Sequence, residues 1–106
     1  MHNRRRARLA DAAGSFTYAE WLALTLSYRE RCAYCGGGGP PQVEHRVPLS
    51  LGGTNSIDNI LPACRRCNAR KHTLTDEEFR ARLAAEARGE RWLREAPLEW
   101  SYDAAG

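Results

Sequence analysis

The sequence predicts a small α+β domain with a structural four-cysteine zinc site and flanking helices, and three observations lead to it. The chain has 106 residues, which allows one domain with a limited core that a bound metal ion would help to stabilise. Two Cys-x-x-Cys pairs bracket two short extended runs that a loop rich in Gly and Asn separates. Two Thr-x-x-Glu patterns, one before and one after this stretch, precede apolar residues at helical spacing.

The charge along the chain divides it into a basic part and an acidic part. Residues 1–75 carry eleven Lys and Arg against five Asp and Glu, and residues 76–106 carry five against eight. We expect residues 1–15 to form a flexible basic arm and residues 16–106 a single domain, with its core at 31–75 and a C-terminal helix and tail at 76–106. The arm's four arginines could follow a phosphate backbone or act as a solubilising tail. The basic part predicts a polyanionic partner.

No apolar run reaches the length of about 20 residues that a membrane-spanning helix needs. The N-terminus has no apolar segment of the kind that a secretory signal carries. We therefore expect a cytoplasmic protein without a membrane partner. In that compartment paired cysteines serve as metal ligands more often than they form disulfides.

The elements follow in order from local patterns. The first capping box, Thr17 to Glu20, predicts a helix over about 18–29 with an apolar stripe that faces the core, made by Trp21, Leu24 and Tyr28 with Leu22 and Leu26 beside them. Short extended runs at 42–45 and 58–61 predict a two-stranded hairpin with a wide, irregular connection. A helix is expected from near Cys64 to about His72.

The second capping box, Thr75 to Glu78, predicts a last helix that ends near Arg88, before Gly89. Its apolar stripe comprises Phe79, Leu83 and Ala87. The tail that follows is rich in large apolar residues, which could pack back on the domain or bind a partner: Trp92, Leu93, Leu98, Trp100 and Tyr102.

The two Cys-x-x-Cys pairs lie 28 residues apart and supply four thiolates, Cys32, Cys35, Cys64 and Cys67. Four thiolates fill the tetrahedral coordination of zinc and leave no position for a substrate water, so we predict a structural zinc. Gly36, directly after the second thiolate, suits a turn that needs positive φ. A thiol redox protein would need a thioredoxin-like βαβ pattern, which the sequence lacks.

Between the cysteine pairs stands the dipeptide Glu44-His45. A carboxylate oxygen is a ligand that Mg²⁺ or Mn²⁺ prefers. An imidazole, with an ordinary pKa of about 6.5, can take a proton from water near neutral pH. On its own such a dipeptide is more often an ordinary surface pair, so its meaning depends on the surrounding motif.

That motif comprises Glu44-His45-x-x-Pro48, Gly52-Gly53 and the run Asn59-Ile-Leu-x-x-Cys64-x-x-Cys67-Asn68-x-x-Lys71. With the upstream Cys32-x-x-Cys35, it closely resembles the HNH endonucleases of the zinc-bearing, McrA-like type over about residues 31–75. The resemblance implies a ββα-metal fold, in which a hairpin and a helix clasp one catalytic divalent ion.

The resemblance also implies roles for individual residues. Glu44 and Asn68 would bind the catalytic ion, His45 would be the general base, and Asn59 would brace the hairpin, orienting the histidine or approaching the metal. Glu stands where Asp is more frequent, and Asn takes the final position. An amide oxygen in that position favours Mg²⁺ or Mn²⁺ over a transition metal.

Four cationic residues lie on the same predicted helix and could contact the phosphates that flank the cut: Arg65, Arg66, Arg70 and Lys71. Arg46 could stabilise charge in the transition state or be an ordinary surface arginine. His72, four residues after Asn68, could be a further metal ligand, although we favour an exposed histidine at the helix end.

The resulting hypothesis is a metal-dependent endonuclease, of bacterial or phage origin, that hydrolyses DNA and leaves 5′-phosphate and 3′-hydroxyl ends. RNA is a second substrate that the same chemistry would allow, and a protein partner could supply the choice of target. The alternative is a zinc-ribbon module that binds nucleic acid without cutting it. Such a module has no need for the four residues Glu44, His45, Asn59 and Asn68 together.

Overall fold

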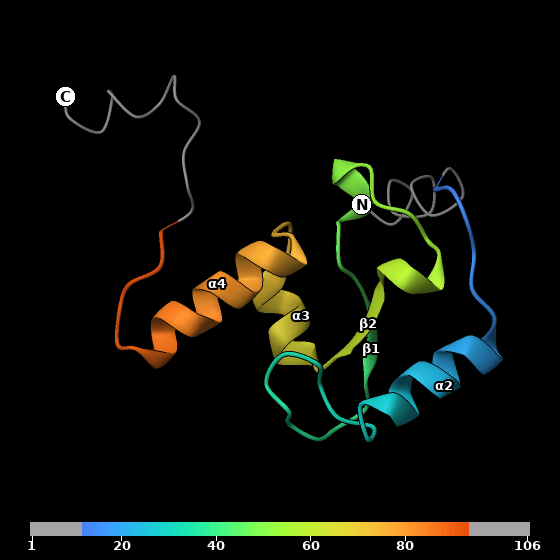
Figure 1. The fold of residues 1–106 in the computed structure, drawn as a ribbon, viewed down its shortest axis with the longest axis horizontal. Helices are drawn as coiled ribbons and strands as arrows, with labels where there is room; N and C mark the ends of the chain where they lie inside the picture. The colour runs from blue at the N-terminus through green and yellow to red at the C-terminus, as the bar shows by residue number, and fades with distance from the viewer. Residues whose placement is uncertain (1–11, 94–106) are drawn as a thin grey trace.

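A computed structural model of the chain describes residues 12–93. Its elements are α2 (Tyr18–Ser27), β1 (Gln42–His45), the 3₁₀ turns η1 (Leu49–Leu51) and η2 (Ile57–Asn59), β2 (Ile60–Ala63), α3 (Arg65–Lys71) and α4 (Asp76–Ala87). The hairpin of β1 and β2 stands between α2 on one side and α3 with α4 on the other (Figure 1). This is the small α+β fold that the sequence predicts.

Helix α2 begins with the predicted capping box. Thr17 Oγ1 accepts from the backbone N–H of Glu20 at 3.0 Å, and Glu20 Oε1 accepts from the N–H of Thr17 at 2.8 Å. The helix ends at Ser27, two residues before the predicted Arg29, because Arg29 itself has a φ of +55°.

Only part of the predicted apolar stripe of α2 faces the core. Trp21, Leu24 and Tyr28 are half-buried, whereas Leu22 and Leu26 are exposed. The inward side of the helix packs against β2. A short two-stranded sheet covers little of a helix surface, so the stripe that packs is narrower than predicted.

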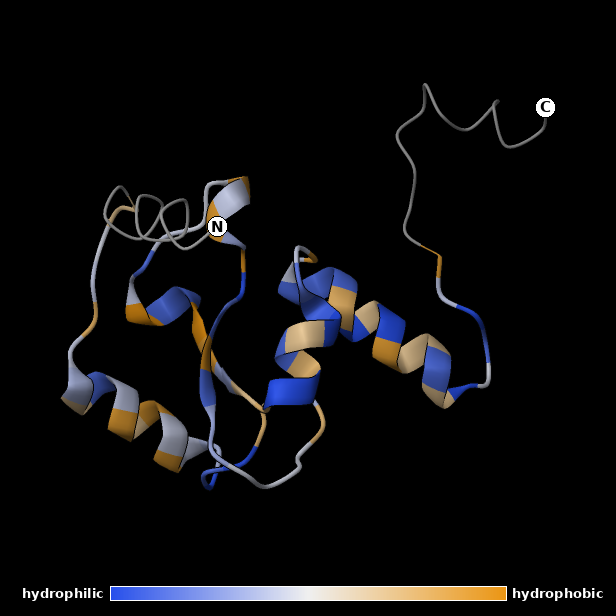
Figure 2. Ribbon diagram, turned by 180° about the vertical axis from the view of Figure 1, so that it is seen from behind, coloured by the Kyte–Doolittle hydropathy of each residue, from blue (hydrophilic) through white to orange (hydrophobic). Residues whose placement is uncertain are grey.

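The first strand has the predicted bounds, but the second begins at Ile60 rather than Asp58. Residues 57–59 form a 3₁₀ turn, which delays the strand until Ile60. The strands pair antiparallel, with Gln42 opposite Ala63 and His45 opposite Ile60. All four residues of β2 are buried, and Figure 2 shows the hydrophobic start of this strand against the more hydrophilic β1.

Helices α3 and α4 confirm two further predictions. Cys64 is the N-cap of α3, and its sulfur accepts from the backbone N–H of Cys67 at 3.4 Å. Thr75 and Glu78 form the second capping box. Along α4, Phe79 is buried as predicted, but Ala87 is exposed.

The main buried cluster joins the metal-ligand stretch to the last helix. Its members are Cys32, Ala63, Cys67, Leu74 and Phe79. Trp92 packs against this cluster, Leu93 is 72% exposed, and the other predicted tail residues lie outside the described part of the chain. Two of the five core residues are cysteines, so the core depends on whatever holds the thiols together.

None of the helices between residues 12 and 93 combines the length and the apolar character needed to cross a membrane.

Candidate metal centre and catalytic site

The four cysteines that the sequence predicts as zinc ligands come together in one cluster. Their sulfur atoms all lie within 4.8 Å of one another, and Cys35 Sγ is 3.7 Å from Cys64 Sγ. A disulfide would bring two sulfurs to about 2.05 Å. Around a tetrahedral zinc with Zn–S bonds of about 2.3 Å, sulfurs stand about 3.8 Å apart. The thiol geometry therefore fits a closed zinc site.

Backbone N–H groups point at these sulfurs, as a thiolate cluster requires. Cys32 Sγ accepts from the N–H groups of Tyr34 and Cys35 at 3.4 and 3.5 Å, and Cys35 Sγ accepts from Gly37 at 3.3 Å. Burial of Cys32 opposes ionisation, but the backbone donors outweigh it and lower the pKa of this thiol to about 7. Burial and the neighbouring thiols raise the pKa of Cys67. Gly36 has a φ of +71°, the positive value predicted for the turn that follows Cys35.

The second site lies where β1 meets α3. Glu44 is 7% exposed, and its Oε1 accepts hydrogen bonds from the backbone N–H of His45 at 2.9 Å and from Lys71 Nζ at 3.3 Å. Lys71 Nζ also donates to the carbonyl oxygen of His45 at 2.7 Å. Every described contact of the carboxylate uses Oε1, so Oε2 has no partner between residues 12 and 93.

Lys71, predicted to contact phosphates, is withdrawn from solvent in this structure. Its side chain is fully buried and points at Glu44 rather than at solvent. Helix α3 packs against β1, and this packing turns the helix face that carries Lys71 inward. A buried carboxylate needs a counter-charge, and Lys71 provides it.

The imidazole of His45 is half-buried and held by a loop residue. Its Nε2 lies 2.9 Å from Oδ1 of Asn55, which stands ten residues further along the chain. The sequence pattern placed Asn55 only among loop residues. No local signal indicates this contact, because the course of the loop between η1 and η2 brings the two residues together.

Asn59 braces the backbone around the end of β1. Its Oδ1 accepts from the N–H of Val47 at 2.9 Å, while its Nδ2 donates to the carbonyl oxygens of Val47 and Thr54 at 3.1 and 2.8 Å. A Cβ at Gly53 would overlap the Val47 carbonyl, so this close approach requires glycine. Both polar groups of the Asn59 side chain are thus hydrogen-bonded to the backbone of the loop that follows His45.

Asn68 is half-buried on α3 and faces β1. Its Nδ2 donates to Oε1 of Gln42 at 2.8 Å, and Gln42 lies two residues before Glu44 on the same side of the strand. Lys71, three residues after Asn68, contacts Glu44 itself. A carboxylate oxygen and an amide oxygen on facing elements form a donor set that fits a hard divalent cation.

His72 follows α3 directly and is exposed, with a φ of +45°. Its backbone N–H donates to the carbonyl oxygen of Asn68 at 3.1 Å, which closes the helix. The structure thus places His72 at the helix end, and its assignment as a further metal ligand stays a prediction.

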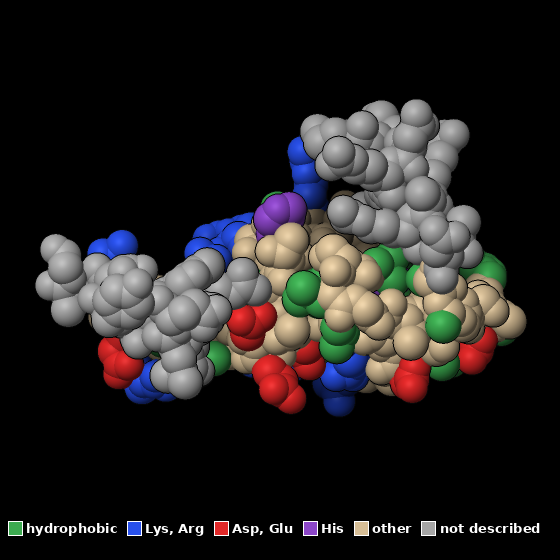
Figure 3. All heavy atoms as spheres, turned by 90° about the horizontal axis from the view of Figure 1, so that it is seen from above, with side chains coloured by type: hydrophobic (Ala, Val, Ile, Leu, Met, Phe, Trp, Pro, Cys, Tyr) green, Lys and Arg blue, Asp and Glu red, His purple; other side chains and the backbone are tan. Residues whose placement is uncertain are grey.

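The predicted arginines differ in their surroundings. Arg65 and Arg66 are exposed and make no side-chain hydrogen bond or ion pair to residues 12–93. Arg70 pairs with Glu86 at 2.6 Å and lies over the ring of Phe79. Figure 3 shows Lys and Arg side chains at separate places on one face, beside a histidine, with acidic groups along one edge. On that face the basic residues form no single continuous patch.

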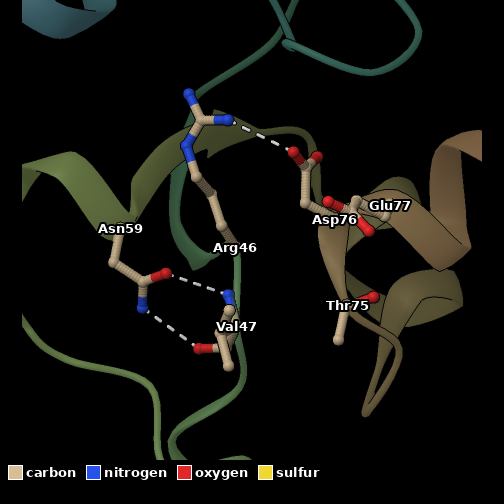
Figure 4. A pocket seen from close by; sticks show the side chains of 6 residues that line it. All are labelled: Arg46, Val47, Asn59, Thr75, Asp76 and Glu77. Atoms are coloured by element: carbon tan, nitrogen blue, oxygen red, sulfur yellow. Dashed lines mark hydrogen bonds and ion pairs between the residues drawn. The ribbon is translucent and has the colours of Figure 1, made fainter.

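A pocket of about 370 Å³ opens beside the hairpin, lined by Arg46, Val47, Asn59, Thr75, Asp76 and Glu77 (Figure 4). Arg46 crosses it to form an ion pair with Asp76 at 3.2 Å. Glu44, His45 and Asn68 do not line this pocket. The pocket therefore shares Asn59 and Arg46 with the predicted site but not the predicted metal ligands or the predicted base. Arg46 ties the hairpin to α4.

Comparisons with known proteins agree with this geometry. The model of the HNH endonuclease family matches residues 32–74, which hold both cysteine pairs and the stretch from Glu44 to Lys71. A Bacillus subtilis (strain 168) protein named "SPbeta prophage-derived putative HNH endonuclease YoqL" is 28% identical over 90 residues, which cover 74% of this chain and 39% of the relative. The chain thus spans about two fifths of that relative's length. Residues 32–74 are thus similar to the HNH endonuclease family, and their hairpin, helix and four-cysteine cluster are consistent with a zinc-bearing ββα-metal fold.

Proposed function

We propose that the chain is a metal-dependent endonuclease that hydrolyses phosphodiester bonds in DNA. One observation carries the proposal. Glu44 and His45, neighbours at the end of β1, are each fixed by residues from other elements, Lys71 and Asn55. Within residues 12–93, Glu44 Oε2 and His45 Nδ1 have no hydrogen-bond partner. A carboxylate and an imidazole held in this way suit metal-assisted hydrolysis.

Glu44 and Asn68 would hold a divalent ion of the Mg²⁺ or Mn²⁺ class through oxygen atoms. When bound, such an ion stabilises negative charge on the phosphoryl group and on the leaving oxygen. His45 Nδ1 takes a proton from the attacking water, and the water oxygen bonds to phosphorus. The bond from phosphorus to the 3′ oxygen breaks, and that oxygen takes a proton from solvent. The products are a 5′-phosphate and a 3′-hydroxyl end.

Asn59 serves this site as a brace rather than as a ligand, because its amide hydrogen bonds all go to the backbone of Val47 and Thr54. On α3, Arg65 and Arg66 are exposed, unlike Lys71, and could meet phosphates beside the cut. Such contacts fix the position of DNA without reading its sequence. A protein partner could therefore supply the choice of target.

The test is a plasmid assay with supercoiled DNA in Mg²⁺, Mn²⁺ or EDTA, scored for nicked and linear product. Wild-type protein should cut only with the divalent ion, and His45→Ala should lose roughly 10²–10⁴-fold in rate while it still binds DNA. Asp58→Ala, an exposed change on η2, serves as the matched control. DNA binding by wild-type protein without cleavage under any metal would instead support a zinc-ribbon binding module.

A further inference from the structure

We infer that Asn55 is a positioning residue for His45, and that the segment at Ala13–Gly14 holds Asn55 in place. The inference rests on the proposed function, because it names the residues that prepare the proposed general base. It goes beyond that function because neither Asn55 nor the N-terminal segment is among the residues to which the proposed reaction gives a role. Four observations carry it.

The first observation is the contact itself. His45 Nε2 lies 2.9 Å from Asn55 Oδ1. An amide oxygen can only accept, so this contact is a hydrogen bond when the hydrogen of the neutral ring resides on Nε2. The lone pair is then on Nδ1, which is the atom that must take a proton from water. Asn55 thus selects the tautomer that the proposed reaction needs.

The second observation is that the loop carrying Asn55 is held from its N-terminal side. The carbonyl oxygen of Thr54 accepts a hydrogen bond from Asn59 Nδ2 at 2.8 Å. Asn59 also hydrogen-bonds to the backbone N–H and the carbonyl oxygen of Val47. Val47 lies two residues after His45. The brace therefore fixes the distance between the chain that leaves His45 and the chain that arrives at Asn55.

The third observation is that Asn55 is also held by the N-terminal segment. The backbone N–H of Asn55 donates to the carbonyl oxygen of Ala13 at 2.8 Å. This segment lies 42 positions before Asn55 and precedes α2, so it reaches the loop across the fold. The N-terminal segment therefore contacts the loop at Asn55, the same residue whose side chain contacts the imidazole of His45.

The fourth observation is the fit of Gly14. A Cβ at this position would overlap Ser56 Oγ, and Gly14 has a φ of +82°, which side chains disfavour. A larger residue would require Ser56 or the segment itself to shift, in a backbone conformation that it would not readily adopt. Glycine therefore permits the close contact that Ala13 makes with Asn55.

The hydrogen bond would contribute most during the reaction. When Nδ1 takes a proton, the ring becomes positively charged and the Nε2–H bond to Asn55 becomes charge-assisted, which strengthens it. The same bond holds the ring plane, so Nδ1 points in one direction before the substrate arrives. Asn55 thereby acts through His45 and need not touch the phosphate.

The kinetic test compares Asn55→Ala, Asn55→Asp and the control Asp58→Ala on supercoiled plasmid with Mg²⁺. Asn55→Ala should lower the single-turnover rate roughly 10–100-fold, as losses of supporting hydrogen bonds commonly do, and leave the dissociation constant for DNA unchanged. Asn55→Asp keeps an acceptor oxygen and should recover most of the rate. A purely structural role predicts no such rescue.

The second test reads the tautomer directly and needs no cleavage. ¹⁵N NMR of the zinc-loaded protein, at a pH where the ring is neutral and with His45→Ala to assign the signal, should show hydrogen on Nε2 in wild type and in Asp58→Ala. Asn55→Ala and Gly14→Val should both give a mixed population. An unchanged tautomer in Asn55→Ala would overturn the inference. A shifted tautomer in a protein that cuts no DNA would overturn the proposed function and leave the contact standing.

Discussion

The ammonium of Lys71 lies 3.3 Å from Oε1 of Glu44, and both side chains are withdrawn from solvent. Lys71 also donates to the carbonyl oxygen of His45 at 2.7 Å. One cation on α3 therefore fixes the side chain of the proposed metal ligand and the backbone of the proposed base. A buried charge pair thus links α3 to β1, the two elements that carry the proposed catalytic residues.

Removal of the Lys71 ammonium should destabilise the domain strongly. In Lys71→Met, Glu44 would stay buried without a counter-charge, and we expect a loss of about 3–5 kcal/mol in the free energy of unfolding. Lys71→Met combined with Glu44→Gln removes both charges and should recover part of that loss. Urea denaturation of the zinc-loaded proteins measures the free energy of unfolding of each variant. Arg66→Met, an exposed change on the same helix, should stay within about 0.5 kcal/mol of wild type. Equal stability of Lys71→Met and Arg66→Met would refute the stabilising role of the buried pair.

The thiol cluster should make folding depend on zinc. Metal analysis should find about one zinc per chain, as four thiolates predict. Removal by a strong chelator should unfold the protein, because metal binding of this kind supplies on the order of 10 kcal/mol. Circular dichroism before and after chelation, with Cys67→Ser alongside, measures the effect. A zinc-free protein with unchanged spectra and thermal midpoint would contradict the assignment.

The two exposed arginines of α3 should determine part of the salt dependence of DNA binding. Each phosphate contact contributes about 0.9 to the slope of log K against log salt for duplex DNA. Arg65→Ala with Arg66→Ala should therefore reduce the slope by about 2, as fluorescence anisotropy across a salt series would show. Arg88→Ala, at the end of α4 beside Glu90, is the control. If both proteins keep the wild-type slope, these arginines do not meet phosphates.

Tyr34 offers a test of the interior between the zinc cluster and α4. Its ring packs edge-on against Phe79, and its hydroxyl is buried without a hydrogen bond to the described residues. Burial, reinforced by the nearby carboxylate of Asp76, which approaches the hydroxyl without a hydrogen bond of 3.5 Å or less, and by the charge of Glu44, raises the pKa of Tyr34, so the hydroxyl stays protonated. Tyr34→Phe removes this unpaired group and should raise the free energy of unfolding by about 1 kcal/mol. A loss of similar size in the same denaturation assay would mean that the hydroxyl has a partner.

Local patterns predicted the elements well where short-range chemistry decides them. Both capping boxes form as predicted, since Thr and Glu three residues apart satisfy each other's backbone groups without help from the rest of the fold. The second strand starts two residues later than predicted, because its boundary depends on the turn at 57–59 and on pairing with β1. Patterns of local sequence contain neither of these constraints.

The sequence by itself determined the four-cysteine cluster, the two capped helices, the first strand and the motif that resembles the HNH family, because fixed spacings encode them. Tertiary structure decided which way the cations of α3 face. Packing against β1 turns Lys71 inward to Glu44 and leaves Arg65 and Arg66 in solvent. It also decided that Asn55 reaches His45, since the fold of a loop and its contact with a distant segment set that distance. Spacing along the chain specifies which residues can share a metal ion, whereas burial and loop closure specify which side chains meet.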